Sequence, residues 1–351
     1  MKFQQHQVAA GVLLLSAGAA SAQWTVTNLN VGGLSWAYGA DGTRQVGYVT
    51  GPERAAIWNR TAASFVSVHP SGAGTSQLLG AGGGKQVGYA TFNNQQQAGV
   101  WSGTAASFVN LHPAGASFSA ARKTDGTQHV GSVTIGPGPG SNAALWTGTS
   151  SAFTSLHPSG AIASYGGGVR NGQQVGTANF GEGDNAALWT GSAASHVNLH
   201  PSGAVRSEAL NTSGTHQVGL VVTSAGGNAA LWSGTAESWV NLNPAGATNG
   251  VAWDVLGNFQ VGYVGLNGAF RASIWEGTAE SWVDLSQFLP AGTLISEATG
   301  ISSDGVNIYV SGHGFVNGSS QAFVWTRPVP SPGAVGVVMG VGLLGMRRRR
   351  V

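Results

Sequence analysis

The sequence predicts an all-β fold, a seven-bladed β-propeller in which each blade is a four-stranded antiparallel sheet. One observation is a tryptophan that recurs with spacings of 43, 45, 43, 43, 43 and 50 residues. A period in the forties, with four strand-sized segments per unit, is typical of propeller blades. The second observation is that each end of the repeat region holds only part of a blade. The recurring tryptophans are Trp58, Trp101, Trp146, Trp189, Trp232, Trp275 and Trp325.

The unit from Ser207 to Pro244 shows the repeat most clearly. Short runs at 207–210, 217–222, 228–232 and 238–242 are separated by turns rich in Gly, Asn and Ser. Runs of this length with β-branched and aromatic residues predict an antiparallel meander. The second run carries a Gln-Val-Gly motif, which five units share. Most units end at a His-Pro or Asn-Pro step, where proline removes a ladder donor and stops the strand.

The partial units at the two ends predict how the ring closes. Residues 24–29 look like a fourth strand without the three that should precede it. The last unit ends with the third strand at residues 321–325 and lacks a fourth. The N-terminal strand can therefore complete the last blade and remove the open sheet edges. An open solenoid is the alternative arrangement. The propeller is expected to occupy residues 23–327.

Residues 1–22 carry the parts of a secretory signal in the expected order. Lys2 precedes an apolar run at 8–20, and an Ala-Ser-Ala step ends at Ala22. This pattern predicts export and removal of the segment by signal peptidase, so the mature chain should begin at Gln23.

Residues 328–351 predict a sorting or anchoring segment that reaches the membrane through a short hydrophobic helix. The apolar run at 333–346 is shorter than the roughly 20 residues that usually span a bilayer. The arginine block after it should stay on the cytoplasmic side, which leaves the propeller outside. The residues expected to carry this signal are Val329, Pro330, Pro332, Arg347, Arg348, Arg349 and Arg350.

This tail resembles the PEP-CTERM sorting signal of bacterial exported proteins, in which a Val-Pro-Glu-Pro motif precedes a short membrane segment and a basic end. Ser331 stands where that motif has Glu. The resemblance implies processing by a membrane protease of the exosortase type. A plain C-terminal anchor is the alternative. The predicted location is the cell envelope or cell surface, or secretion after processing.

The repeats between residues 24 and 325 resemble the HAF family of extracellular repeats in bacterial surface proteins. Residues 322–325 match its Ala-Phe-x-Trp strand, and residues 171–176 match its turn and second strand. The resemblance implies a structural repeat and brings no catalytic residues.

Composition narrows the range of functions that the protein can have. Charged residues are 8% of the chain, and between residues 23 and 328 ten basic residues stand against thirteen acidic ones. Nucleic-acid binding needs a basic face, so no nucleic-acid partner is expected. The chain has no cysteine, which excludes a thiol nucleophile, a thiolate metal site and disulfides. No catalytic residue, metal or cofactor is predicted.

Several side chains that suggest chemistry are better explained by structure. The histidine of the exit step recurs at His69, His112, His157 and His200. Because asparagine fills the same place elsewhere, we expect these side chains to hydrogen-bond a turn rather than bind a metal. Glu237 and Glu280 lie in turns of neighbouring blades, so we expect solvated surface rather than a pair of glycosidase carboxylates.

The residue at one position of the first strand varies from unit to unit, while the rest of the unit repeats. The first strand of a blade normally lines the central channel, so variation there predicts a ligand site at the channel mouth. Aromatic rings could stack on a ligand and polar groups could orient it. The predicted ligand-binding residues are Trp36, Gln77, Tyr165, Glu208, Trp253 and Glu297.

Together these observations predict an exported cell-surface or envelope protein that acts as a non-enzymatic interaction or structural scaffold. A glycan or a protein would be its ligand. The alternative is a carbohydrate-binding or carbohydrate-active propeller, a lyase or hydrolase, that works from the channel mouth.

Overall fold

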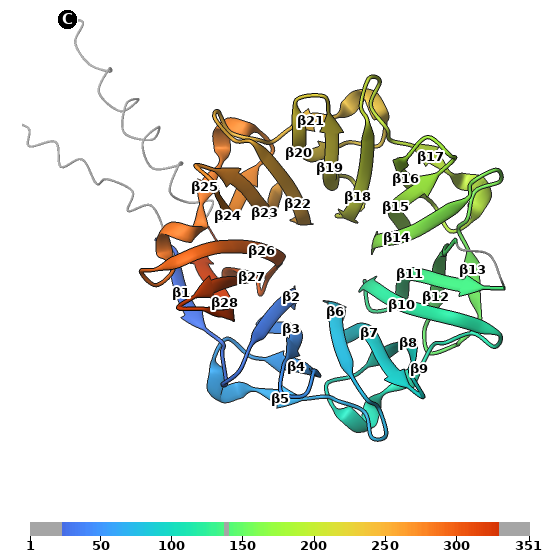
Figure 1. The fold of residues 1–351 in the computed structure, drawn as a ribbon, viewed down its shortest axis with the longest axis horizontal. Coiled ribbons are helices and arrows are strands. Elements are labelled where there is room, and N and C mark those ends of the chain that lie inside the picture. Colours follow the sequence, from blue (N-terminus) through green and yellow to red (C-terminus); the bar gives the residue numbers. More distant parts are fainter. Residues whose placement is uncertain (1–22, 137–139, 330–351) are drawn as a thin grey trace, which may run out of the picture.

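The computed structural model describes residues 23–136 and 140–329, and it confirms the predicted seven-bladed propeller. Seven four-stranded antiparallel sheets surround a central channel (Figure 1). The predicted secretory signal at 1–22 and the predicted C-terminal helix lie outside the described residues, as does the predicted sorting signal apart from Val329. Within the described ranges, no helix is long and apolar enough to cross a membrane.

Each blade runs from its inner strand at the channel to its outer strand at the rim, and the first six blades are consecutive meanders. The strands are β2 (Ser35–Asp41), β3 (Arg44–Val49), β4 (Arg54–Trp58) and β5 (Val66–Ser67); β6 (Ser76–Gly82), β7 (Lys85–Phe92), β8 (Gln95–Trp101) and β9 (Val109–Asn110); β10 (Ala116–Thr124), β11 (Gln128–Ile135), β12 (Asn142–Thr147) and β13 (Phe153–Ser155); β14 (Ala163–Arg170), β15 (Gln173–Asn179), β16 (Asp184–Trp189) and β17 (Val197–Asn198); β18 (Arg206–Thr212), β19 (Gln217–Thr223), β20 (Gly226–Trp232) and β21 (Val240–Asn241); β22 (Asn249–Leu256), β23 (Phe259–Leu266), β24 (Ala269–Glu276) and β25 (Val283–Asp284); and, in the last blade, β26 (Thr293–Ser303), β27 (Asn307–Val316), β28 (Ser319–Pro328) and β1 (Thr25–Asn28).

Single-turn 3-10 helices connect the third and fourth strands of five blades, and one more follows β25. They are η1 (Ala62–Ser64), η2 (Ala105–Ser107), η3 (Ala193–Ser195), η4 (Ala236–Ser238), η5 (Ala279–Ser281) and η6 (Leu285–Phe288).

The last blade closes the ring as predicted. β1 pairs antiparallel with β28, with Val26 opposite Trp325. The Leu29 backbone N–H extends the pairing by donating to the Ala322 carbonyl at 2.8 Å. β1 therefore covers the edge of β28, and the open-solenoid alternative is excluded.

The seven tryptophans lie in the packing between blades, which explains their period. All seven side chains are fully or almost fully buried. Trp189 of the fourth blade, for example, packs in one cluster with Val130 and Leu156 of the third. Each blade contributes one indole to such an interface, so the repeat length of the sequence is the repeat length of the packing.

The Gln-Val-Gly motif has a steric cause and a hydrogen-bonding cause. A Cβ atom on Gly219 would lie 1.9 Å from the Glu208 carbonyl oxygen of the neighbouring strand. Only glycine tolerates such a close backbone approach. The Gln217 amide joins two turns, because its Oε1 accepts from Gly234 N–H at 2.8 Å and its Nε2 donates to the Thr215 carbonyl at 3.2 Å.

The exit histidines hold turns, as predicted. His200 Nε2 donates to the Ala204 carbonyl at 3.2 Å, and Nδ1 lies 2.8 Å from Ser207 Oγ. Ser207 Oγ in turn accepts from the buried Ala186 N–H at 2.9 Å. The side chains of His69, His112 and His157 make the same pair of contacts.

Candidate functional site

Every strand that lines the channel carries a β-bulge at the same place. The register between the first and second strands shifts by one residue in all seven blades. A bulge adds one unpaired residue and turns its side chain in a new direction. We call these seven residues the bulge ring; they are Tyr38, Leu79, Arg122, Gly167, Leu210, Trp253 and Thr299.

The bulge ring encloses the channel cavity. This cavity has a volume of about 220 Å³ and is lined by all seven ring residues together with Lys123, Glu297 and His313. Lys123 on the third blade reaches past the second blade, since its ammonium lies 3.4 Å from the Tyr38 carbonyl on the first blade. The channel is therefore a lined cavity whose walls differ in chemistry.

One wall is aromatic and acidic, and the wall across the channel is basic. β22, β26 and β27 supply Trp253, Glu297 and His313, whereas β10 supplies Arg122 and Lys123. β10 lies across the channel from β26 (Figure 1). Burial lowers the pKa of the Arg122 guanidinium, and the nearby Glu208 carboxylate opposes this shift.

Five of the six predicted site residues occupy equivalent positions on the first strands of their blades. Trp36, Gln77, Tyr165, Glu208 and Glu297 each lie opposite the residue that follows the close-packed glycine of the second strand. In the sixth blade this position is Val251, which lies opposite Tyr263. Trp253 belongs instead to the bulge ring, because the bulge adds a residue that an alignment of repeats does not show.

The structure brings some of these residues together. Trp253 Nε1 donates to Glu297 Oε2 at 3.2 Å, from β22 to β26. Trp36 and Glu297 line a groove of about 300 Å³ between the first and last blades. Tyr165 and Glu208 line a cavity of about 330 Å³ between the fourth and fifth blades, which shares Arg122 with the channel cavity. Gln77 lines none of these three cavities.

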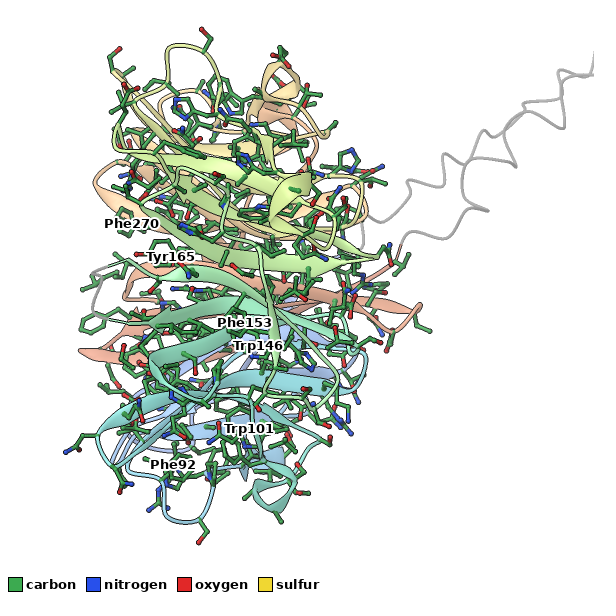
Figure 2. The ribbon with its side chains drawn as sticks, turned by 90° about the vertical axis from the view of Figure 1, so that its right-hand side faces the viewer. Phe92, Trp101, Trp146, Phe153, Tyr165 and Phe270 are labelled. Carbon is green, nitrogen blue, oxygen red and sulfur yellow. The ribbon has the colours of Figure 1, made fainter. Side chains whose placement is uncertain are left out.

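The mouth that these residues form opens on one face of the disc, the face with the turns between second and third strands. Tyr165 and Phe270 both lie at this face, on the left in Figure 2. The described chain leaves the propeller at the opposite face, since Val329 N–H donates to the Val306 carbonyl in the turn between β26 and β27. The ends of the described chain therefore leave the mouth open.

Glu297 and His313 are the unusual titratable pair of the site. They lie opposite each other on β26 and β27, and both line the channel cavity and the groove. Burial raises the pKa of Glu297, and the Trp253 hydrogen bond offsets this only in part. Burial also lowers the pKa of His313 to about 4, and its buried Nδ1 has no hydrogen-bond partner among the described residues.

An aromatic cluster borders this pair. The Trp36 and Tyr48 rings stack with centroids 4.7 Å apart and planes 7° apart. The Tyr38 ring centroid lies 5.8 Å from that of Tyr48 and 6.4 Å from that of His313, which it meets edge-on. Stacked rings of this kind offer flat apolar surface and electron-rich faces to a ligand.

Sequence reasoning missed Tyr38, Arg122, Lys123 and His313. Tyr38 and Arg122 follow from the bulge, which moves the channel-facing position by one residue, and Lys123 comes directly after the bulge on β10. His313 lies on a second strand, which was not expected to reach the channel. Its signal in the sequence is that His313 follows the close-packed glycine where other blades have Tyr48, Tyr89 or Tyr263.

The described residues hold no cluster of three or more His, Asp or Glu placed to bind a metal. Glu237 and Glu280 are exposed in η4 and η5, as predicted. They take no part in the site.

No protein-family model matches the chain, and no curated protein matches it either. Solved structures do resemble its fold. The chain is 13% identical to puromycin hydrolase, with a TM-score of 0.54, and covers 55% of that protein. It is 10% identical to the Pyrococcus horikoshii acylaminoacyl peptidase, with a TM-score of 0.54, and covers 52% of it. These matches cover 86% and 85% of this chain.

A third matching structure is a propeller domain alone. The β-propeller domain of the Trilobed protease from Pyrococcus furiosus, described as having an open velcro topology, gives a TM-score of 0.55 at 8% identity. The match covers 85% of this chain and 96% of that domain. The chain described here differs in that β1 and β28 close the last blade. At such low identities the likeness establishes the fold.

These comparisons contradict the predicted function. The neighbours are propeller-bearing peptidases, and neither a surface scaffold nor a carbohydrate-active protein stands among those described above. The prediction was wrong because it rested on the two ends of the chain and on a repeat resemblance, which concern location and architecture. The chain covers about half the length of the first two peptidases.

Proposed function

We propose that this chain is the peptide-binding propeller of a peptide-hydrolysing system, and that an unfolded peptide segment binds in the channel cavity from the open mouth. The observation that carries the proposal is the channel cavity, inside which an aromatic and acidic wall lies opposite a basic wall. A peptide offers apolar side chains to the rings and backbone and end groups to the charges.

The dimensions and the chemistry of the cavity support this ligand class. A cavity of about 220 Å³ holds one or two side chains and is too small for a folded domain. Leu79, Leu210 and Trp253 supply apolar surface, and Arg122 and Lys123 supply donors. Ligand sites commonly combine apolar walls with a few placed polar groups. The peptidase neighbours provide the class of reaction that the bound segment would enter.

Replacing Trp253 tests the proposal. Trp253→Ala removes the largest ring residue and the donor to Glu297. We expect the full chain to bind fluorescein-labelled unstructured nonapeptides, and the variant to bind them at least about tenfold more weakly, which corresponds to about 1.4 kcal/mol. Fluorescence polarisation measures both affinities.

Phe180→Ala is the matched control, since Phe180 is an aromatic residue 40% exposed in the turn between β15 and β16, away from the channel. It should leave peptide affinity unchanged. Absence of peptide binding to the full chain, or equal affinities for the Trp253 variant and the unchanged chain, contradicts the proposal.

We also propose export, from the sequence alone. Signal peptidase would cleave after Ala22, and an exosortase-like protease would act on the tail that begins near Val329. Intact-mass analysis of the chain recovered from its native envelope checks both sites; a chain that still holds residues 1–22 contradicts the first.

A further inference from the structure

We propose, building on the proposed function, that Glu297 binds the positively charged group of the peptide, an ammonium or a guanidinium, in the groove between the first and last blades. The groove and the channel cavity meet at Glu297 and His313, which line both. A bound segment in the channel would therefore reach Glu297 without leaving the cavity.

Glu297 is a carboxylate without a counter-ion. Arg206–Glu208 and Arg271–Asp284 are the salt bridges found in the described residues, and neither includes Glu297. The side-chain hydrogen bond that it does receive comes from the neutral indole of Trp253. A partly buried carboxylate lacking a cation is costly, and a cation supplied by a ligand would recover that cost.

His313 does not fill this role. It faces Glu297 across the β26–β27 pair, but burial lowers its pKa to about 4, so it is neutral at neutral pH. Its Nδ1 is buried and unpartnered among the described residues. A neutral imidazole supplies no positive charge to the carboxylate, whereas an ammonium or guanidinium supplies both the charge and several N–H donors.

The other walls favour a cation too. Trp36, stacked on Tyr48, lines the groove with Phe315. Cations are attracted to the faces of such rings within about 6 Å. Leu34 and Ile295 complete an apolar border that would hold the methylene stem of a lysine or arginine. Arg122 and Lys123 belong to the opposite wall of the channel cavity and do not line the groove.

The pH dependence of peptide affinity gives a further test of the Glu297 site. The titratable groups that face Glu297 are His313 on β27, Tyr38 on β2 and Tyr263 on β23. Burial raises the pKa of both tyrosines, so they stay neutral. A cation stabilises ionised Glu297, so binding should lower the pKa that burial raises. Affinity for cationic peptides should therefore fall as the pH is lowered, whereas affinity for neutral peptides should not.

Four alanine pentapeptides separate the sources of the charge when titrated into the full chain by calorimetry. All four are amidated at the C-terminus; one has a free amino end, one is acetylated, one is acetylated with a central lysine, and one is acetylated with a central glutamine. We expect either or both charged peptides to bind at least about tenfold more tightly than the neutral pair, a difference of about 1.4 kcal/mol. The charged peptide that shows the preference identifies the source.

Glu297→Gln should remove this preference and its pH dependence. Glu182→Gln is the matched control, because it removes the same charge from an exposed residue in the turn between β15 and β16 and should keep the preference. Trp36→Leu, which removes one ring and keeps the carboxylate, should reduce the preference severalfold, and near-ultraviolet circular dichroism checks that each variant is folded.

The outcomes distinguish the two proposals. Charged and neutral peptides that bind the unchanged chain equally well overturn the Glu297 site and leave peptide binding standing. A preference that survives Glu297→Gln also overturns it. Failure of all four peptides, and of the labelled nonapeptides, overturns peptide binding itself.

Discussion

Replacing Gly219 by alanine should lower the free energy of unfolding by about 4 kcal/mol or more, the range of severe packing and strain defects. The new methyl group would lie 1.9 Å from the Glu208 carbonyl oxygen and 2.9 Å from its carbon, both of which are backbone atoms. No rotamer change can relieve this contact. Either the β18–β19 hairpin separates, or the β-bulge beside it shifts.

Gly74→Ala is the control for this variant. Its Cβ would meet nothing closer than 3.7 Å, and its φ lies outside the left-handed region. Replacing such a glycine usually changes stability little or raises it by roughly 0.4–1 kcal/mol. Urea unfolding followed by tryptophan fluorescence measures both variants, and equal midpoints for the two would contradict the steric account of the motif.

Leu29→Ala should cost about 2–5 kcal/mol, as buried leucine truncations do. Leu29 is fully buried where β1 ends, and it packs in one cluster with Trp58, Tyr309 and Val324. This cluster joins the first blade to the last. Weakening it should also release β1 and expose the edge of β28, which favours association between chains.

Hydrogen exchange of the β28 amides measures the release directly, and light scattering follows the association. Leu34→Ala provides the comparison, since Leu34 is 37% exposed and lies outside the β1–β28 pair. Unchanged exchange in β28 after Leu29→Ala would show that β1 does not hold the ring closed.

The fold could be predicted because its sequence signals report local chemistry. The tryptophan period marks an indole at every blade interface, and the Gln-Val-Gly motif marks a turn amide next to a close backbone contact. The incomplete units at 24–29 and 321–325 predicted the pairing of β1 with β28 correctly.

The site was predicted only in part, for one physical reason. A β-bulge changes the register by one residue and leaves no mark in a repeat alignment, so the aligned position omits Tyr38 and Arg122 and includes Trp253, which belongs to the bulge ring. The Trp253–Glu297 hydrogen bond joins residues 44 positions apart, which no local pattern reveals. Burial of the His313 ring depends on packing and could not be inferred from its sequence neighbours.

The central claim is that peptides bind inside the bulge ring from the open mouth. Photo-crosslinking tests it most directly: nonapeptides that carry one benzophenone group are irradiated with the full chain, and mass spectrometry locates the attachment sites. The account predicts crosslinks on β2, β22, β26 and β27, near Tyr38, Trp253 and His313, and their loss when unlabelled peptide competes. Crosslinks spread over the outer strands, or unaffected by competition, would contradict it.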